Sequence, residues 1–238
     1  IKALSEPSAT EVQDLTGDSL ANYLMVNPIT TLDPGIVGGF TADQLKSLSA
    51  PQVAALSLAQ VAALSPDSLN ALNDTTFTAA LTATQASALT PEQMTKLSVQ
   101  ALQGLGADIS SVSPASLAAL PTARLNQLLA AQVQSLTPAQ VLALNTASFN
   151  ALPVTAMTSA QIASLSATQL QQLTPGSIAS ITTTAIKGLS QAQVDALTPA
   201  QIERLIPEQI ANIAATSLRG LSGADIASLS AEQIQGFT

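Results

Sequence analysis

Large apolar residues recur every eight positions along this chain, and a second apolar residue follows each of them by five. We call the first residue the anchor of an eight-residue unit, or octad. A short fixed period is typical of repeat proteins, in which neighbouring units share one core. The anchors are Pro7, Leu15, Leu24, Leu32, Phe40, Leu48, Leu56, Leu64, Leu72, Leu81, Leu89, Leu97, Leu105, Val112, Leu120, Leu128, Leu136, Leu144, Leu152, Met157, Leu165, Leu173, Ile181, Leu189, Leu197, Leu205, Ile213, Leu221, Leu229 and Phe237.

The period slips four times and resumes each time. Of the 29 spacings between the 30 anchors, 25 are eight residues; the others are nine (15–24 and 72–81), seven (105–112) and five (152–157). No linker or change of composition interrupts the pattern. We therefore expect one continuous domain over residues 1–238, either a fragment of a longer array or an open-ended unit that stacks on itself.

The polar positions of the octad predict the start of a helix. In the octad that begins at Leu136, Thr137 suits the N-cap and Pro138 suits the first helical position, where a missing N–H costs nothing. Gln140, at the third position, can reach back to the N–H of Thr137 and close a capping box. Leu136 and Val141 then form a hydrophobic staple across the helix start.

A new helix start every eight residues means that no helix can be long. Ser or Thr fills the capping position in 19 of 29 octads. We predict an all-α solenoid of very short helices, one per octad, each of about one and a half turns. Five glycines directly before an anchor are expected to end helices in the left-handed conformation: Gly39, Gly104, Gly188, Gly220 and Gly236.

A β-solenoid is the alternative fold, because a period of eight is even. The apolar spacings of five and three suit one face of a strand poorly. Ala and Gln are abundant and favour helices, and Pro recurs where a strand ladder needs an N–H. One octad buries too little apolar surface to fold alone, so octads must stack. Two or three octads per superhelical turn are both compatible with the pattern.

The amino-acid composition disfavours several classes of partner and excludes several kinds of chemistry. Charged residues make up 9 % of the chain and aromatic residues 2 %, and the net charge is −8. This charge disfavours nucleic acid and anionic membrane surfaces as partners. The chain has no Cys and no His, which excludes disulfides, Cys/His metal sites and His-based acid–base catalysis. No signal peptide or transmembrane run is visible. We expect no enzymatic activity, no cofactor and no membrane insertion.

The most regular polar feature is a row of glutamines at the third helical position. We expect them to cap helices; a polar stripe for lateral contacts is the alternative. They are Gln44, Gln52, Gln60, Gln85, Gln93, Gln132, Gln140, Gln161, Gln169, Gln193, Gln201, Gln209 and Gln233.

Other candidate chemistry is weaker. The segment 35–39 is rich in glycine, but no Lys-Ser/Thr follows it, so a bend is expected there rather than a phosphate loop. No Ser or Thr has a His or Lys base at motif spacing. Five acidic residues offer oxygen ligands for Ca²⁺ but lack the spacing of a calcium loop, and solvated charge is expected for them: Asp14, Asp18, Asp43, Asp108 and Asp225.

The octad Leu-Thr/Ser-x-x-Gln-Val/Ile-x-Ala, as in 48–72 and 189–213, resembles the octapeptide tandem repeats of very large secreted or surface proteins of bacteria, often labelled adhesin-like or haemagglutinin-like. The resemblance covers essentially the whole chain. It implies an extracellular or cell-surface scaffold, such as a stalk, filament or surface layer. Its partner would be itself or a neighbouring segment of a larger surface protein.

The resemblance carries over no catalytic, cofactor-binding or metal-binding residue. The alternative function is a solenoid binding module whose groove holds a peptide or glycan in adhesion. Scarce aromatic residues argue against glycan stacking. An exposed row of non-repeat residues clustered in space would favour such a groove, and the four slips of the period are the places to look for one. The alternative is that the slips are drift in a tolerant array.

Overall fold

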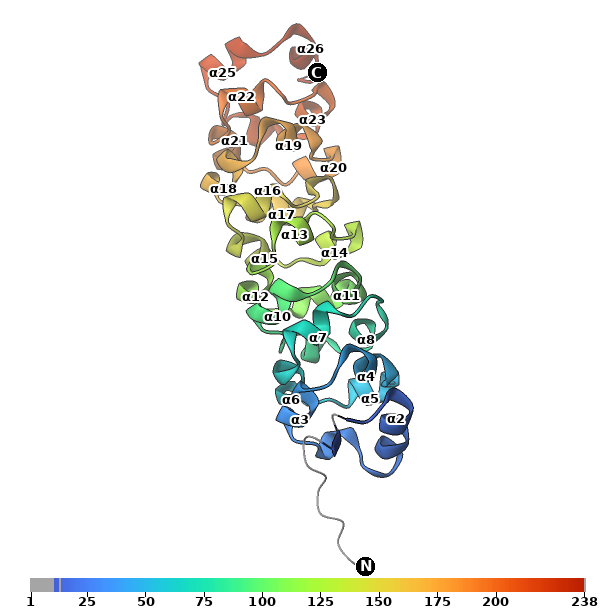
Figure 1. Cartoon of the computed structure of the whole chain (residues 1–238). Coiled ribbons are helices and arrows are strands. Elements are labelled where there is room, and N and C mark those ends of the chain that lie inside the picture. The colour runs from blue at the N-terminus through green and yellow to red at the C-terminus, as the bar shows by residue number, and fades with distance from the viewer. Residues whose placement is uncertain (1–10, 13, 238) are drawn as a thin grey trace, which may run out of the picture. The chain divides into compact units, whose positions relative to one another are not determined.

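The computed structural model describes residues 11, 12 and 14–237, and this part of the chain contains short helices and no strand. Apart from α2 (Gly17–Val26), which has ten residues, its α-helices have four to six residues each. The predicted all-α solenoid of short helices is confirmed, and the β-solenoid alternative is wrong. Figure 1 shows the succession of short helices along the chain.

The chain divides into two compact units, residues 1–120 and 121–238, each described here by itself. The expectation of one continuous domain stays a prediction. After α2, the first unit contains η1 (Ile29–Thr31), α3 (Pro34–Gly38), α4 (Ala42–Ser47), α5 (Ala50–Ala54), α6 (Leu58–Ala63), α7 (Pro66–Asn70), α8 (Thr76–Ala79), α9 (Ala83–Ala86), α10 (Pro91–Lys96), α11 (Val99–Gly104), η2 (Gly106–Ser111) and α12 (Pro114–Ala118), where η marks a 3₁₀ helix.

The second unit repeats the same kind of element. It contains α13 (Thr122–Leu125), α14 (Ala130–Ser135), α15 (Pro138–Ala143), α16 (Thr146–Asn150), η3 (Val154–Ala156), α17 (Ser159–Ser164), α18 (Ala167–Gln172), α19 (Pro175–Ser180), α20 (Thr183–Ile186), α21 (Gln191–Asp195), α22 (Pro199–Ile202), α23 (Pro207–Asn212), α24 (Ala215–Leu218), α25 (Gly223–Ser228) and α26 (Ala231–Gln235).

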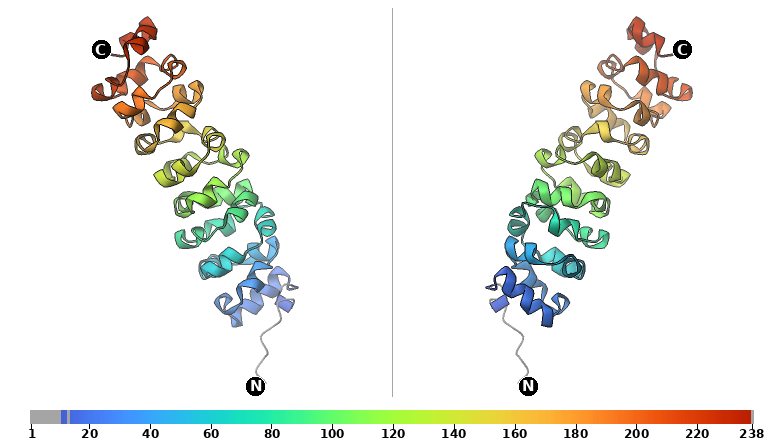
Figure 2. Two further views of the ribbon diagram at one scale, coloured as in Figure 1. Left: turned by 90° about the vertical axis from the view of Figure 1, so that its left-hand side faces the viewer. Right: turned by 90° about the vertical axis from the view of Figure 1, so that its right-hand side faces the viewer.

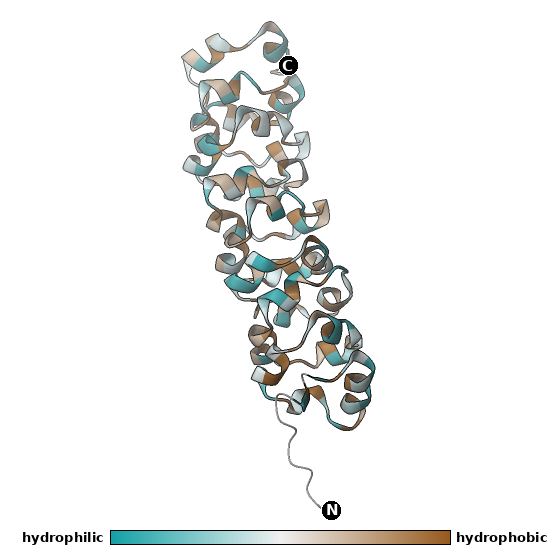
Figure 3. Cartoon of the chain, viewed as in Figure 1, coloured by the Kyte–Doolittle hydropathy of each residue, from teal (hydrophilic) through white to brown (hydrophobic). Residues whose placement is uncertain are grey.

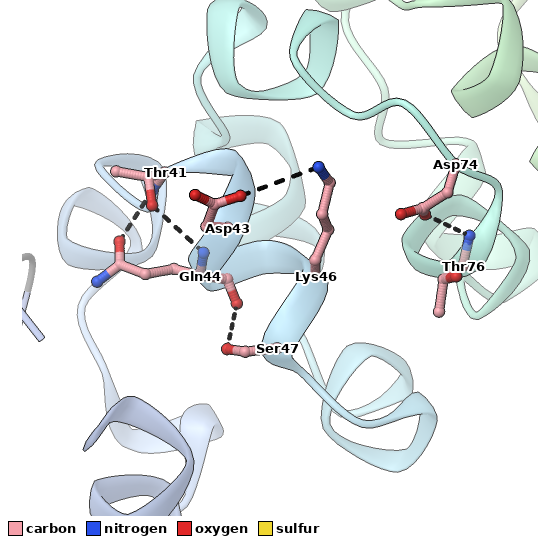
Figure 4. A network of polar contacts seen from close by, with 7 residues as sticks. All are labelled: Thr41, Asp43, Gln44, Lys46, Ser47, Asp74 and Thr76. Atoms are coloured by element: carbon pink, nitrogen blue, oxygen red, sulfur yellow. Dashed lines mark hydrogen bonds and ion pairs between the residues drawn. The ribbon is translucent and has the colours of Figure 1, made fainter. Parts of the chain in front are cut away.

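The helices begin where the octad predicts. At α4, Thr41 N donates to Gln44 Oε1 at 2.9 Å, and Gln44 N donates to Thr41 Oγ1 at 3.3 Å, which closes the capping box (Figure 4). Eight helices start at a proline, as the octad around Pro138 predicts: Pro34, Pro66, Pro91, Pro114, Pro138, Pro175, Pro199 and Pro207.

Within each unit, helices pack on the element three places before them. In the first unit α6 packs on α3 and α10 on α7; in the second unit α20 packs on α17 and α24 on α21. Three octads therefore complete one turn of the solenoid within each unit, which decides between the two stacking schemes that the sequence allows. Figure 2 shows these layers from two further sides.

The core of each unit consists of the anchors and the apolar residues five positions after them. Val61 and Leu64 are examples from the first unit, and Ile162 and Leu165 from the second; all four are buried. Figure 3 shows hydrophobic and hydrophilic residues mixed along the short helices, as is expected where one side of a helix faces a core.

The glycines before the anchors have a different role from the predicted one. Gly39 and Gly236 have φ angles of −84° and −67°, and Gly106 is the only described residue with a positive φ. A Cβ at Gly188 would collide with the carbonyl oxygen of Ser159, three octads earlier. The prediction of left-handed helix ends at these glycines is wrong, and close approach of backbones in successive turns explains Gly188 instead.

The slips of the period are absorbed locally. The ten-residue α2 spans the slip at 15–24, and 3₁₀ helices η2 and η3 lie within the slips at 105–112 and 152–157. In the slip at 72–81, Asp74 Oδ1 accepts the N–H of Thr76 at 2.9 Å (Figure 4).

Candidate functional site

The glutamines of the octad bond in two directions. In α22, Gln201 Oε1 accepts the N–H of Thr198 at 2.9 Å, and Gln201 Nε2 donates to the carbonyls of Leu170 at 2.8 Å and Leu173 at 2.7 Å. One carboxamide thus caps its own helix and holds the point where α18 ends, 31 and 28 residues earlier.

The same arrangement recurs along both units, and we call it the glutamine ladder. Gln60 and Gln93 make it in the first unit, and Gln193 and Gln209 in the second. Eleven of the thirteen predicted glutamines are buried, whereas Gln52 is partly exposed. The capping prediction is confirmed, and the alternative of a surface stripe is wrong for the buried eleven.

Other side chains take over where an octad lacks glutamine. Ser116 Oγ donates to the carbonyl of Leu89 at 2.8 Å. In the second unit, Asn150 Oδ1 accepts the N–H of Thr174 at 3.2 Å. Among the described residues, no buried side-chain nitrogen or oxygen lacks a hydrogen-bond partner. The sequence did not predict the long-range half of this network, because those partners depend on the number of octads per turn.

The octad of α20 departs from this rule because its third position is Ala185, which is buried. A ladder glutamine such as Gln201 bonds the N–H three residues before it and the carbonyls 31 and 28 residues before it. A glutamine at position 185 would therefore meet Thr182 N and the carbonyls of Val154 and Met157. In the described part of the chain, no hydrogen bond uses Thr182 N or the Met157 carbonyl, and the Val154 carbonyl accepts only Met157 N.

A hollow of about 280 Å³ lies at this place, wholly within the second unit. Its lining includes Ala185, Met157, Thr155, Ser159 and Thr184. Thr155 and Met157 belong to the slip at 152–157, one of the four places that the sequence indicates for a search.

A second hollow of about 450 Å³ lies where α24 packs on α21. Gln191, Asp195, Arg219 and Gly220 line it, so it presents one carboxylate and one guanidinium to the solvent.

The acidic residues stay apart. Within the described residues, no three acidic side chains form a group able to hold a metal ion. Asp43 lies 3.9 Å from Lys46 Nζ (Figure 4), and Asp225 Oδ2 accepts the N–H of Ser222 at 2.9 Å. The glycine-rich segment 35–39 lies mostly in α3 and forms no phosphate loop.

Comparison of the chain with protein-family models, curated proteins and solved structures gives no match. None of the helices in the described part of the chain is long and apolar enough to cross a membrane.

Proposed function

We propose that this protein is a structural, non-enzymatic scaffold, an extended segment of a bacterial cell-surface protein, filament or surface layer. The glutamine ladder supports this proposal, because within each unit it bonds an octad that carries such a glutamine to the junction between the octads three and four before it. Such bonding repeats along the axis of a solenoid, so the number of octads sets the length. The extracellular location rests on the resemblance of the octad to repeats of bacterial surface proteins.

Exposed apolar side chains in α25 and α26 support self-association or contact with a neighbouring segment. Ile226 and Ile234, five positions after their anchors, are 51 % and 52 % exposed, whereas the equivalent Ile202 and Ile210 are buried. Phe237, three residues after Ile234, is 41 % exposed. Covering this apolar surface would favour association by the hydrophobic effect.

Small-angle X-ray scattering over a concentration series tests the scaffold. A compact protein of this length would have a radius of gyration of about 18 Å. A continuous stack with three octads per turn and about 9 Å per turn would form a rod of about 90 Å, with a radius of gyration of about 28 Å. A rod that lengthens with concentration indicates self-assembly, and one of fixed length indicates a spacer. A compact particle would contradict the proposal.

A binding module is the second candidate function. The observation that favours it is the hollow beside Ala185, where the repeat is interrupted and backbone polar groups lack partners. The scattering experiment does not depend on this hollow, so the two candidates are tested separately.

A further inference from the structure

The hollow beside Ala185 occupies the place of one ladder glutamine. The octad of α22 provides the comparison, since Gln201 joins Thr198 N to the carbonyls of Leu170 and Leu173. Sixteen residues earlier, the corresponding groups are Thr182 N and the carbonyls of Val154 and Met157. The spacing is unchanged because Val154 and Met157 are three residues apart, as Leu170 and Leu173 are.

These groups are the complement of a primary carboxamide. Thr182 N needs an acceptor oxygen, the Met157 carbonyl needs a donor, and the Val154 carbonyl can accept a second donor besides Met157 N. One carboxamide supplies the acceptor and both donors together. None of the hollow's lining residues carries a charge. A carboxylate of the same size would offer no donor and would face carbonyl oxygens, and an ammonium group would offer no acceptor.

We propose that this hollow binds the carboxamide of an asparagine or glutamine side chain presented by a partner polypeptide. The exposed hydroxyls of Thr155, Ser159 and Thr184 lie around the same hollow and provide polar contacts for the backbone of that partner. This inference goes beyond the scaffold role and gives the second candidate function a ligand class.

Nuclear magnetic resonance of the ¹⁵N-labelled chain tests the proposal with acetamide as the probe. Acetamide should shift the amide signal of Thr182 with half-saturation on the order of 10 mM, because four non-hydrogen atoms supply little binding energy. Acetate at equal ionic strength should leave that signal in place. The amide of Thr198, whose acceptor is Gln201, is the internal control and should not respond.

In the variant Ala185→Gln, the new side chain should fill the hollow, and acetamide should no longer shift the amide signal of Thr182. Equal shifts with acetamide and acetate, or equal shifts at Thr182 and Thr198, would overturn the proposal, as would a response that persists in a folded Ala185→Gln variant. If that variant does not fold, the comparison of the two probes on the unaltered chain decides alone.

A peptide pair extends the test to a polypeptide ligand. Acetyl-Ala-Gln-Ala N-methylamide should bind more tightly than acetamide, by about tenfold or more, through its additional backbone contacts. The matched acetyl-Ala-Glu-Ala N-methylamide should not shift Thr182. Binding of both peptides alike would show that the carboxamide is not recognised.

Discussion

At the scale of the residue, a single side-chain type explains most of the buried polar chemistry. The ladder glutamines satisfy a helix-start N–H with their oxygen and distant carbonyls with their nitrogen. Gln60 is an example, with its Nε2 at 2.8 Å from the carbonyls of both Ile29 and Leu32. A buried backbone polar group without a hydrogen-bond partner lowers the free energy of unfolding by about 1–3 kcal/mol. By bonding such groups, the glutamines allow the short helices to stack closely.

Gln60→Glu should destabilise the protein by about 3 kcal/mol or more, because a buried carboxylate would face two carbonyl oxygens. Gln52→Glu is the matched control. Gln52 is partly exposed, and its Oε1 accepts the N–H of Ser49 at 2.8 Å, a bond that a glutamate keeps. It should change stability by no more than about 0.5 kcal/mol. Urea unfolding measures the free energy of unfolding of both variants. An equal loss of stability in the two would contradict the role of the Gln60 Nε2 bonds.

Glu232 links stability to pH. A hydrogen bond from its own backbone N–H and one from Ser230 hold the pKa of its carboxyl below the ordinary value of 4.5. A lowered folded-state pKa adds stability above the unfolded value, and this stability is lost as pH falls from about 4.5 through the folded value. Carboxyl NMR titration should give a midpoint below 4.5, raised in Ser230→Ala. A midpoint at or above 4.5 would refute this assignment.

At the scale of the element, the sequence predicts the helices better than their contacts. The capping box lies within four consecutive residues, so Thr137 and Gln140 are recognisable without knowledge of the fold. The distant carbonyl partners of a glutamine such as Gln201 depend on three octads completing a turn. The role of Gly188 is not visible in the sequence for the same reason, since the backbone that approaches it belongs to another turn. The slip at 152–157 is visible in the sequence, but the hollow beside it depends on which octads stack on one another.

Gly220→Ala tests the close approach of α24 to α21. The added Cβ would meet the carbonyl oxygen of Gln191 and the backbone nitrogen of Asp195, so stability should fall by about 1–3 kcal/mol. Gly223→Ala is the control at an exposed first position of α25, with nothing within 4 Å of its Cβ. It should stabilise by about 0.5–1 kcal/mol. Thermal unfolding compares the two, and a loss in both variants would argue against a specific contact at Gly220.

At the scale of the whole molecule, the octad is the unit that can be added or removed. Each ladder glutamine bonds to the octads three and four before it, whichever octads these are. Residues that differ between octads, such as Ala185 or Ser116 at the third helical position, change single places without changing the register. A repeat protein of this kind tolerates changes of length that would unfold an ordinary domain.

Deletion of residues 190–197 removes one octad and should leave a folded protein. Gln201 would then meet the carbonyls of Ile162 and Leu165, which Gln193 holds in the intact chain. The urea midpoint should change little, and the m-value should fall slightly with the lost surface. Insertion of four alanines after Leu197 should lower the midpoint much more, because it places later octads half a unit out of register. Equal damage from both changes would contradict the octad register.

The ladder also determines how the protein responds to mechanical load. Its long-range bonds span only three to four octads, so a pulling force can free one turn while the next turn keeps its own bonds. Each freed turn of about 24 residues releases about 80 Å of extended chain, against about 9 Å along the axis when folded. Under tension each unit would therefore lengthen in successive small steps and recoil when the load falls, as an elastic tether does.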